Sequence, residues 1–119
     1  MKKSSTEIAN EYITIATLEG EAKLTGNYRY GNRLAKKLNK ITAEISTDSV
    51  FAESVITEVL SSSSDRARAL ISTDALRLGL CTEKALTTLE EISHRPDIIG
   101  FGSKMSLMIW RGEVSGKTL

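Results

Sequence analysis

The residue types that most often carry chemistry are sparse in this chain, which has one cysteine, Cys81, and one histidine, His94. A nucleophilic thiol needs a base within hydrogen-bonding reach. These two residues fall at opposite ends of one predicted helix, which is too far apart to share a proton. We interpret Cys81 as a small buried residue at a turn and His94 as a helix C-terminal or surface residue. The sequence therefore predicts no catalytic pair.

Metal and phosphate sites are not indicated either. A structural zinc site needs about four ligands at short spacings, and one cysteine with one histidine cannot supply them. Glu90 and Glu91 form an acidic pair, but adjacent residues on a helix point apart. The lone Gly100-x-Gly102 pattern does not make a phosphate-binding loop. We therefore expect no metal, no cofactor and no enzymatic activity.

Basic side chains are concentrated on one face of the second predicted helix. They are Arg29, Arg33, Lys36, Lys37 and Lys40, with Tyr28 and Tyr30 beside them. Two interpretations remain open: a solvated face opposite an apolar stripe, or a groove for phosphate groups or for an acidic protein. The candidate partner-binding residues on this face are Arg29, Tyr30, Arg33 and Lys37.

A second candidate set is acidic and comprises Glu83, Glu90 and Glu91, with Asp97 beyond them. In stacked helix pairs the second helix of each pair lines the concave surface, where these carboxylates would meet a basic nuclease. The alternative is ordinary solubility charge. The first predicted helix is also acidic, and its carboxylates are expected to pair across the hairpin with the basic second helix.

Six amphipathic helices are predicted to position these residues, because apolar side chains recur at three-and-four spacing along the chain. The first begins at a capping box, Ser4 with Glu7, and ends before Gly26-Asn27. The others cover about residues 28–46, 48–60, 64–78, 82–93 and 99–110, and Asp48, Ser64 and Thr82 are expected to cap three of them. In the last helix the residues expected to face inward are Phe101, Met105, Met108 and Ile109, with Trp110 in or capping the core.

Composition indicates one domain. The chain has 119 residues, with 16 basic and 15 acidic side chains and a net charge of +1, which exerts no strong attraction on nucleic acid or anionic lipid. No apolar run follows Lys2 and Lys3, and none approaches the roughly 20 residues of a membrane helix. We expect one cytoplasmic helical domain over residues 1–119, with no membrane contact and a frayed tail near 113–119.

The segment from Asp65 to Ser93 is similar to a HEAT-type repeat. Asp65 and Arg68 stand where such repeats often carry an acid and an arginine, and Ala85-x-x-x-Leu89 matches the close packing of the two helices. The signature is imperfect, because Arg66-Ala67-Arg68 stands where Val-Arg is usual.

Two further segments, TGNYRYGNRLAKKLNKI and IIGFGSKMSLMIWRGEV, extend the resemblance. Together with the repeat they resemble a small bacterial family of HEAT-like domains of unknown function. That family has a glycine-asparagine-aromatic turn before a basic helix, and a C-terminal Gly-Phe and Trp-x-Gly. Here these are Gly26-Asn27-Tyr28, Gly100-Phe101 and Trp110-Arg111-Gly112. The resemblance covers most of residues 25–112.

The resemblance implies an all-α fold of about six antiparallel helices stacked as a short HEAT-like α-solenoid. Members of such families often lie beside bacterial toxins, as in contact-dependent growth inhibition. It therefore implies a protein-binding module, a cytoplasmic immunity protein that neutralises a cognate toxin domain such as a nuclease. The alternative is a nucleic-acid-associated adaptor that uses the basic face of residues 28–46.

Overall fold

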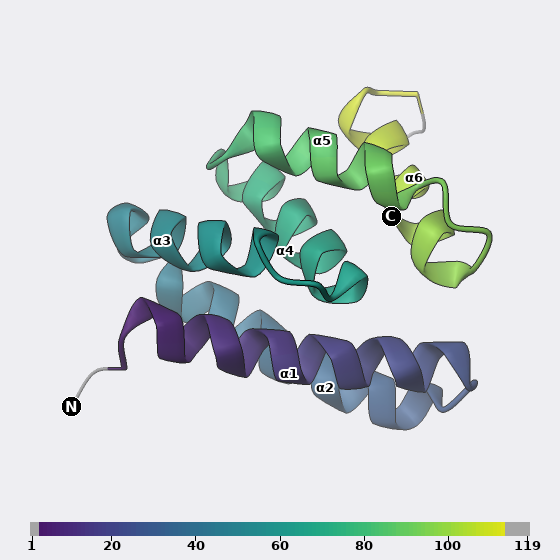
Figure 1. Cartoon of the computed structure of the whole chain (residues 1–119), viewed down its shortest axis with the longest axis horizontal. Helices are drawn as coiled ribbons and strands as arrows, with labels where there is room; N and C mark the ends of the chain where they lie inside the picture. Colours follow the sequence, from purple (N-terminus) through teal and green to yellow (C-terminus); the bar gives the residue numbers. More distant parts are fainter. Residues whose placement is uncertain (1–2, 114–119) are drawn as a thin grey trace.

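The computed structural model describes residues 3–113, and all regular secondary structure in that range is helical (Figure 1). The predicted all-α fold with about six helices is confirmed. The expected frayed tail falls, apart from Glu113, outside the described residues. The helices are α1 (Ser5–Leu24), α2 (Tyr28–Ile45), α3 (Ser49–Leu60), α4 (Asp65–Leu78), α5 (Thr82–Ile92) and α6 (Ile98–Trp110).

Side-chain caps determine where most of these helices begin. The Ser4 hydroxyl accepts from the backbone N–H of Glu7, whose carboxylate accepts from the N–H of Ser4, so the predicted capping box is confirmed. Asp48 and Ser64 cap α3 and α4 as predicted. The prediction that Thr82 caps α5 was wrong, because Thr82 is the first residue of that helix. The residue before it, Cys81, has the left-handed backbone conformation with φ 51° and makes no side-chain cap.

Two helices, α1 and α4, organise the packing. Helix α1 lies against α2, α3 and α4, while α4 also lies against α3, α5 and α6 (Figure 1). The short connections bring α1 beside α2 and α4 beside α5, as expected for helical hairpins. However, α3 contacts α1 far more than it contacts its predecessor α2. A regular HEAT-like solenoid stays a prediction.

Small and β-branched residues fill most of the interior. The largest fully buried apolar side chains are Tyr12, Val55, Ile56, Val59, Ile71 and Leu89. Alanines at buried positions of four helices, such as Ala16, Ala52 and Ala75, allow the helix backbones to approach closely. The core is therefore assembled from contacts between helices, not within any one hairpin.

A buried ion pair joins α1 to α4. The Arg66 guanidinium binds Glu19 through two hydrogen bonds, Nε–Oε1 at 2.6 Å and Nη2–Oε2 at 3.0 Å, and Glu19 is only 2 % exposed. Arg66 reaches Glu19 by passing over Gly20, where a methyl group would lie 2.7 Å from the Arg66 Cγ. Gly20 thus lies within α1 without ending the helix, and it provides the point where Arg66 crosses α1.

A polar cluster centred on Asp74 adds a second connection among α1, α2 and α4. Tyr12 and Thr42 donate hydrogen bonds to Asp74 Oδ2 at 3.2 and 3.0 Å, and Arg77 donates to Oδ1 at 2.7 Å. Burial raises the pKa of Asp74, and burial together with this carboxylate raises the pKa of Tyr12 well above its usual value. The shared acceptor fixes three helices at one point.

The expected inward face of α6 was partly wrong. Phe101 is 62 % exposed, Trp110 is 47 % exposed, and Ile99, Ser103 and Leu107 face the core instead. The reason is steric: Gly100 lies against the carbonyl oxygen of Arg95, where a Cβ would clash with backbone. That close contact requires Gly100 to face Arg95, and the next residue, Phe101, is then on the side of α6 that faces solvent.

Two glycine-to-alanine substitutions should have opposite effects on the free energy of unfolding. Gly20→Ala should lower it by about 1–2 kcal/mol, because the new methyl group meets the stem of Arg66. Gly31→Ala in α2 should raise it by about 0.5–1 kcal/mol, because its Cβ would make ordinary contacts of 3.5 Å or more and alanine favours helix. Urea denaturation measures both; a stabilising Gly20→Ala would contradict the crossing geometry.

Candidate functional site

The basic face of α2 is the most distinctive surface of the described chain. Its five cations are all exposed, and they lie opposite a stripe that is almost fully buried. The buried stripe consists of Gly31, Leu34, Leu38, Ile41 and Ile45. The basic face consists of Arg29, Arg33, Lys36, Lys37 and Lys40. Because the stripe fixes the rotation of α2 about its axis, the predicted basic face must point to solvent.

No ion pair engages these five cations within residues 3–113. In the same range every arginine of α4, of the α5–α6 connection and after α6 has a carboxylate partner. These arginines are Arg66, Arg68, Arg77, Arg95 and Arg111. Among the described arginines, only Arg29 and Arg33 of α2 lack a carboxylate partner, whereas lysines without one also occur on α1, α5 and α6 at Lys23, Lys84 and Lys104.

The carboxylates of α1 do not neutralise α2 as expected. Glu7 caps its own helix, Glu11 pairs with Lys3 at 2.8 Å, and Glu19 is buried against Arg66. No ion pair between α1 and α2 exists in the described range. The expectation of pairing across the hairpin was therefore wrong, because α1 turns these acids toward other partners.

Two tyrosines stand at the N-terminal end of the basic face. The Arg33 guanidinium lies 5.7 Å from the centre of the Tyr30 ring, and the Lys23 ammonium lies 5.7 Å from that of Tyr28. Such cation–π contacts orient long side chains at small energetic gain. Tyr28 is 54 % exposed, so a large ring is offered to solvent beside the cations.

The charge of the face contrasts with the rest of the molecule. The five cations carry +5 while the whole chain carries +1, so the remaining charges sum to −4. The rest of the chain therefore has a net negative charge, so an acidic partner is attracted by the α2 face but not by the remaining charges taken together. This favours a partner whose negative charge is confined to a patch of similar size.

The acidic candidates are less available than the basic ones. Glu90 accepts a hydrogen bond from Arg111 at 2.9 Å and Glu91 accepts one from Arg68 at 3.1 Å. Glu83 carries no ion pair in the described range and lies in the first turn of α5, away from the other two. The structure does not bring the three together with the residues of α2.

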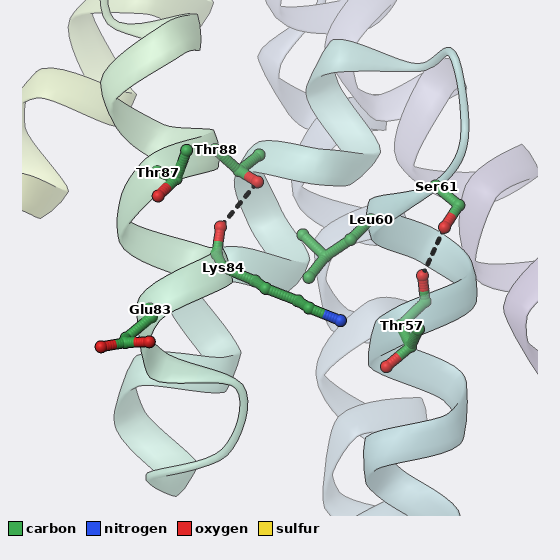
Figure 2. Close-up of a pocket in the computed structure, with 7 residues that line it drawn as sticks. All are labelled: Thr57, Leu60, Ser61, Glu83, Lys84, Thr87 and Thr88. Carbon is green, nitrogen blue, oxygen red and sulfur yellow. Dashed lines mark hydrogen bonds between the residues drawn. The ribbon is translucent and has the colours of Figure 1, made fainter.

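Glu83 lines a shallow pocket of about 390 Å³ between α3 and α5 (Figure 2). The Lys84 side chain extends across it toward α3, and Leu60 forms its apolar part. The hydroxyls of Thr88 and Ser61 donate to backbone carbonyls of their own helices, at 2.8 and 2.9 Å. The polar groups are thus engaged locally, and they do not converge on one point.

An ion-pair network connects the start of α4 with the α5–α6 connection. Asp65 accepts hydrogen bonds from Arg68 at 3.2 Å and from Arg95 at 2.9 Å, and Arg95 also binds Asp97 at 2.6 Å. Asp97 caps α6 through the N–H groups of Ile99 and Gly100. The Arg95 guanidinium, and then these N–H groups, lower the pKa of Asp97 to about 2.

The residues with potential for covalent chemistry lie apart. Half-buried Cys81 precedes the first residue of α5 and exposed His94 follows its end. A helix of 11 residues between them spans about 16 Å, which is beyond hydrogen-bonding reach. Among residues 3–113, no group of three or more His, Cys, Asp and Glu side chains is placed to hold a metal ion.

Comparison of the sequence with protein-family models, and of the chain with curated proteins and solved structures, gave no match. The resemblance to a bacterial HEAT-like family stays a prediction. Within the described part of the chain, no helix has the length and apolar character needed to cross a membrane.

The network around Arg95 should make stability depend on pH below about 4. The folded pKa of Asp97, about 2, lies below the ordinary value of 3.8, so its stabilising contribution is complete above pH 4 and is lost as pH falls toward 2. Asp97→Asn keeps a good helix cap but removes the charge. The wild-type chain should unfold at higher urea than Asp97→Asn at pH 7, and the two midpoints should converge between pH 4 and 2. A gap that persists at pH 2 would contradict the charge-based explanation.

Proposed function

We propose that this chain is a protein-binding module, and that the basic face of α2 contacts an acidic patch on its partner. The observation that carries the proposal is the set of five exposed cations without an internal ion pair, beside ion-paired arginines elsewhere. Exposed charges of one sign accelerate encounter with a complementary surface and select among partners. Tyr28 and Tyr30 add aromatic contact area of the kind that is common at interfaces.

The contrast between the basic face and the net negative charge of the remaining residues supports a protein partner over a long polyanion. Duplex DNA carries charge along its whole length and would also approach the acidic remainder of the surface, which sums to −4. A folded protein can present one acidic patch and leave the rest of its surface neutral or basic. The charges of this chain therefore suit a protein with one acidic patch better than they suit duplex DNA.

The particular form we propose is an immunity protein of the cytoplasm that binds a cognate bacterial toxin domain. This form rests on the resemblance of residues 25–112 to the HEAT-like family. The α2 face would contact an acidic region of the toxin domain, and a rigid helical body would block access to its active site. Because Glu90 and Glu91 pair with arginines of this chain, the basic face is a stronger contact candidate than the acidic set.

The protein encoded by the neighbouring reading frame is the first partner to test, by pull-down and then calorimetry. The double charge reversal Arg33→Glu with Lys37→Glu should weaken the complex about 10- to 100-fold and reduce its salt dependence, because it reverses the centre of the basic face. The matched control is Lys84→Glu with Lys104→Glu, an equal change of charge at exposed residues of α5 and α6.

The control variant should bind within about twofold of the wild-type chain. Equal weakening by both variants would show that net charge, and not the α2 face, controls binding. If the neighbouring protein neither binds nor is neutralised, the immunity form of the proposal is wrong.

Nucleic acid is the second candidate partner, because exposed cations beside tyrosines also suit a single strand. If five phosphates are contacted, a plot of the logarithm of affinity for a labelled RNA oligonucleotide against the logarithm of salt concentration should have a slope of roughly −3.5. The protein-binding proposal predicts instead that such binding disappears by about 100 mM salt. Tight binding at 150 mM salt that Arg33→Glu abolishes would favour the nucleic-acid role.

A further inference from the structure

A groove of about 500 Å³ lies where three helix ends meet: the N-terminal half of α1, the C-terminal end of α2 and the first turn of α3. Its apolar lining comes from Ile8, Ile41, Ile45 and Phe51. Ile8 and Phe51 are only half-buried, so the lining remains open to an apolar side chain. Figure 1 shows these helix ends at the same end of the molecule, opposite the connection between α1 and α2.

The rim of this groove is acidic. Glu11, Glu44 and Asp48 line it, against one cation, Lys3. Asp48 Oδ1 accepts the N–H of Phe51 as the α3 cap, while Glu44 is exposed and has no ion pair in the described part of the chain. The rim therefore has a net negative charge that the chain itself does not balance.

The chain's own Lys3 marks where a cation rests on this rim. Its ammonium donates to Glu11 Oε2 at 2.8 Å. That hydrogen bond, followed by attraction to Glu11, Glu7 and Glu44, raises the pKa of Lys3. Lys3 is still 54 % exposed, so the contact is a surface one that a second cation can join or replace.

We propose that this groove binds a lysine or arginine side chain next to a bulky aliphatic residue on a segment of the partner protein. The carboxylates of Glu11 and Glu44 attract the cation, and the lining formed by Ile8 and Phe51 takes the aliphatic group. This inference rests on the proposed protein-binding function but uses a different surface. It specifies the chemistry of a second contact on the same partner.

The groove also adjoins the basic face. Glu44 lies one helical turn beyond Lys40, so α2 presents cations along most of its length and then a carboxylate at its C-terminal end. A matching partner would carry an acidic patch and, about one helical turn beyond it, a cation with an aliphatic neighbour. The change of sign along one helix would fix the orientation of the complex, because the reversed pose places like charges together.

The test is fluorescence anisotropy with a labelled 12-residue amphipathic peptide of lysine and leucine, titrated with the full-length chain. A glutamate–leucine peptide and a lysine–alanine peptide are the comparison probes. The lysine–leucine peptide should bind at least tenfold more tightly than either one. Equal binding of the lysine–alanine peptide would overturn the role of the apolar lining.

Variants locate the binding. Glu44→Lys should weaken binding of the lysine–leucine peptide about tenfold. The charge-matched control is Glu53→Lys, at an exposed residue of α3 outside this groove. It should change the logarithm of the dissociation constant less than half as much as Glu44→Lys does. Lys3→Ala should tighten binding about two- to threefold by freeing Glu11. Equal loss in Glu44→Lys and Glu53→Lys, with helical content unchanged by circular dichroism, would overturn the groove as the site.

Failure of the peptide test is distinguishable from failure of the proposed function. The peptide assay uses variants at the groove and a synthetic probe, while the partner assay uses Arg33 and Lys37 with a whole protein. Loss of partner binding only in the Arg33 and Lys37 variant, with no peptide binding at all, would leave the basic face as the interface and reject the groove.

Discussion

The fold depends on one buried ion pair, between Glu19 on α1 and Arg66 on α4. Breaking such a pair from one side leaves an unpaired buried charge, which typically costs about 3–5 kcal/mol, a large part of the stability of a domain this size. The pair forms only because Gly20 removes the side chain that would block the path of Arg66. The glycine that weakens α1 as an isolated helix is therefore what allows α1 and α4 to pack closely. The Asp74 cluster adds α2 to the same assembly.

This packing also determines the electrostatics of the surface. Because α1 turns Glu19 inward to α4 and uses Glu11 for Lys3, neither carboxylate reaches the cations of α2. The positive face of α2 remains exposed as a consequence of how α1 is oriented. In α4, α5 and α6, arginines and carboxylates instead meet across helix boundaries and cancel. The proposed interaction surface thus gathers on one helix face five cations that pair with no carboxylate of the described residues.

The two proposed contacts share one helix and differ in sign. The middle of α2 offers cations, and its C-terminal end contributes Glu44 to an apolar groove with an acidic rim. Charge contacts at an exposed face mainly affect encounter rate and orientation, while burial of an apolar side chain slows dissociation. A partner that engages both would gain orientation from α2 and residence time from the groove.

Features that depend on neighbouring residues could be predicted from the amino-acid sequence. Helix boundaries, the caps at Ser4, Asp48 and Ser64, and the position of the basic face on α2 follow from three-and-four spacing and from local hydrogen bonding. Three features follow only from the packing of the helices: the burial of Glu19, the exposure of Phe101 and the groove with an acidic rim. The burial of Glu19 depends on Arg66, which is 47 residues away in the sequence. The exposure of Phe101 depends on the contact of Gly100 with a backbone carbonyl, and the groove forms where three helix ends meet. The spacing of apolar residues predicts which face of a helix is apolar. Contacts between residues far apart in the sequence determine which polar residues are buried and which apolar residues remain exposed.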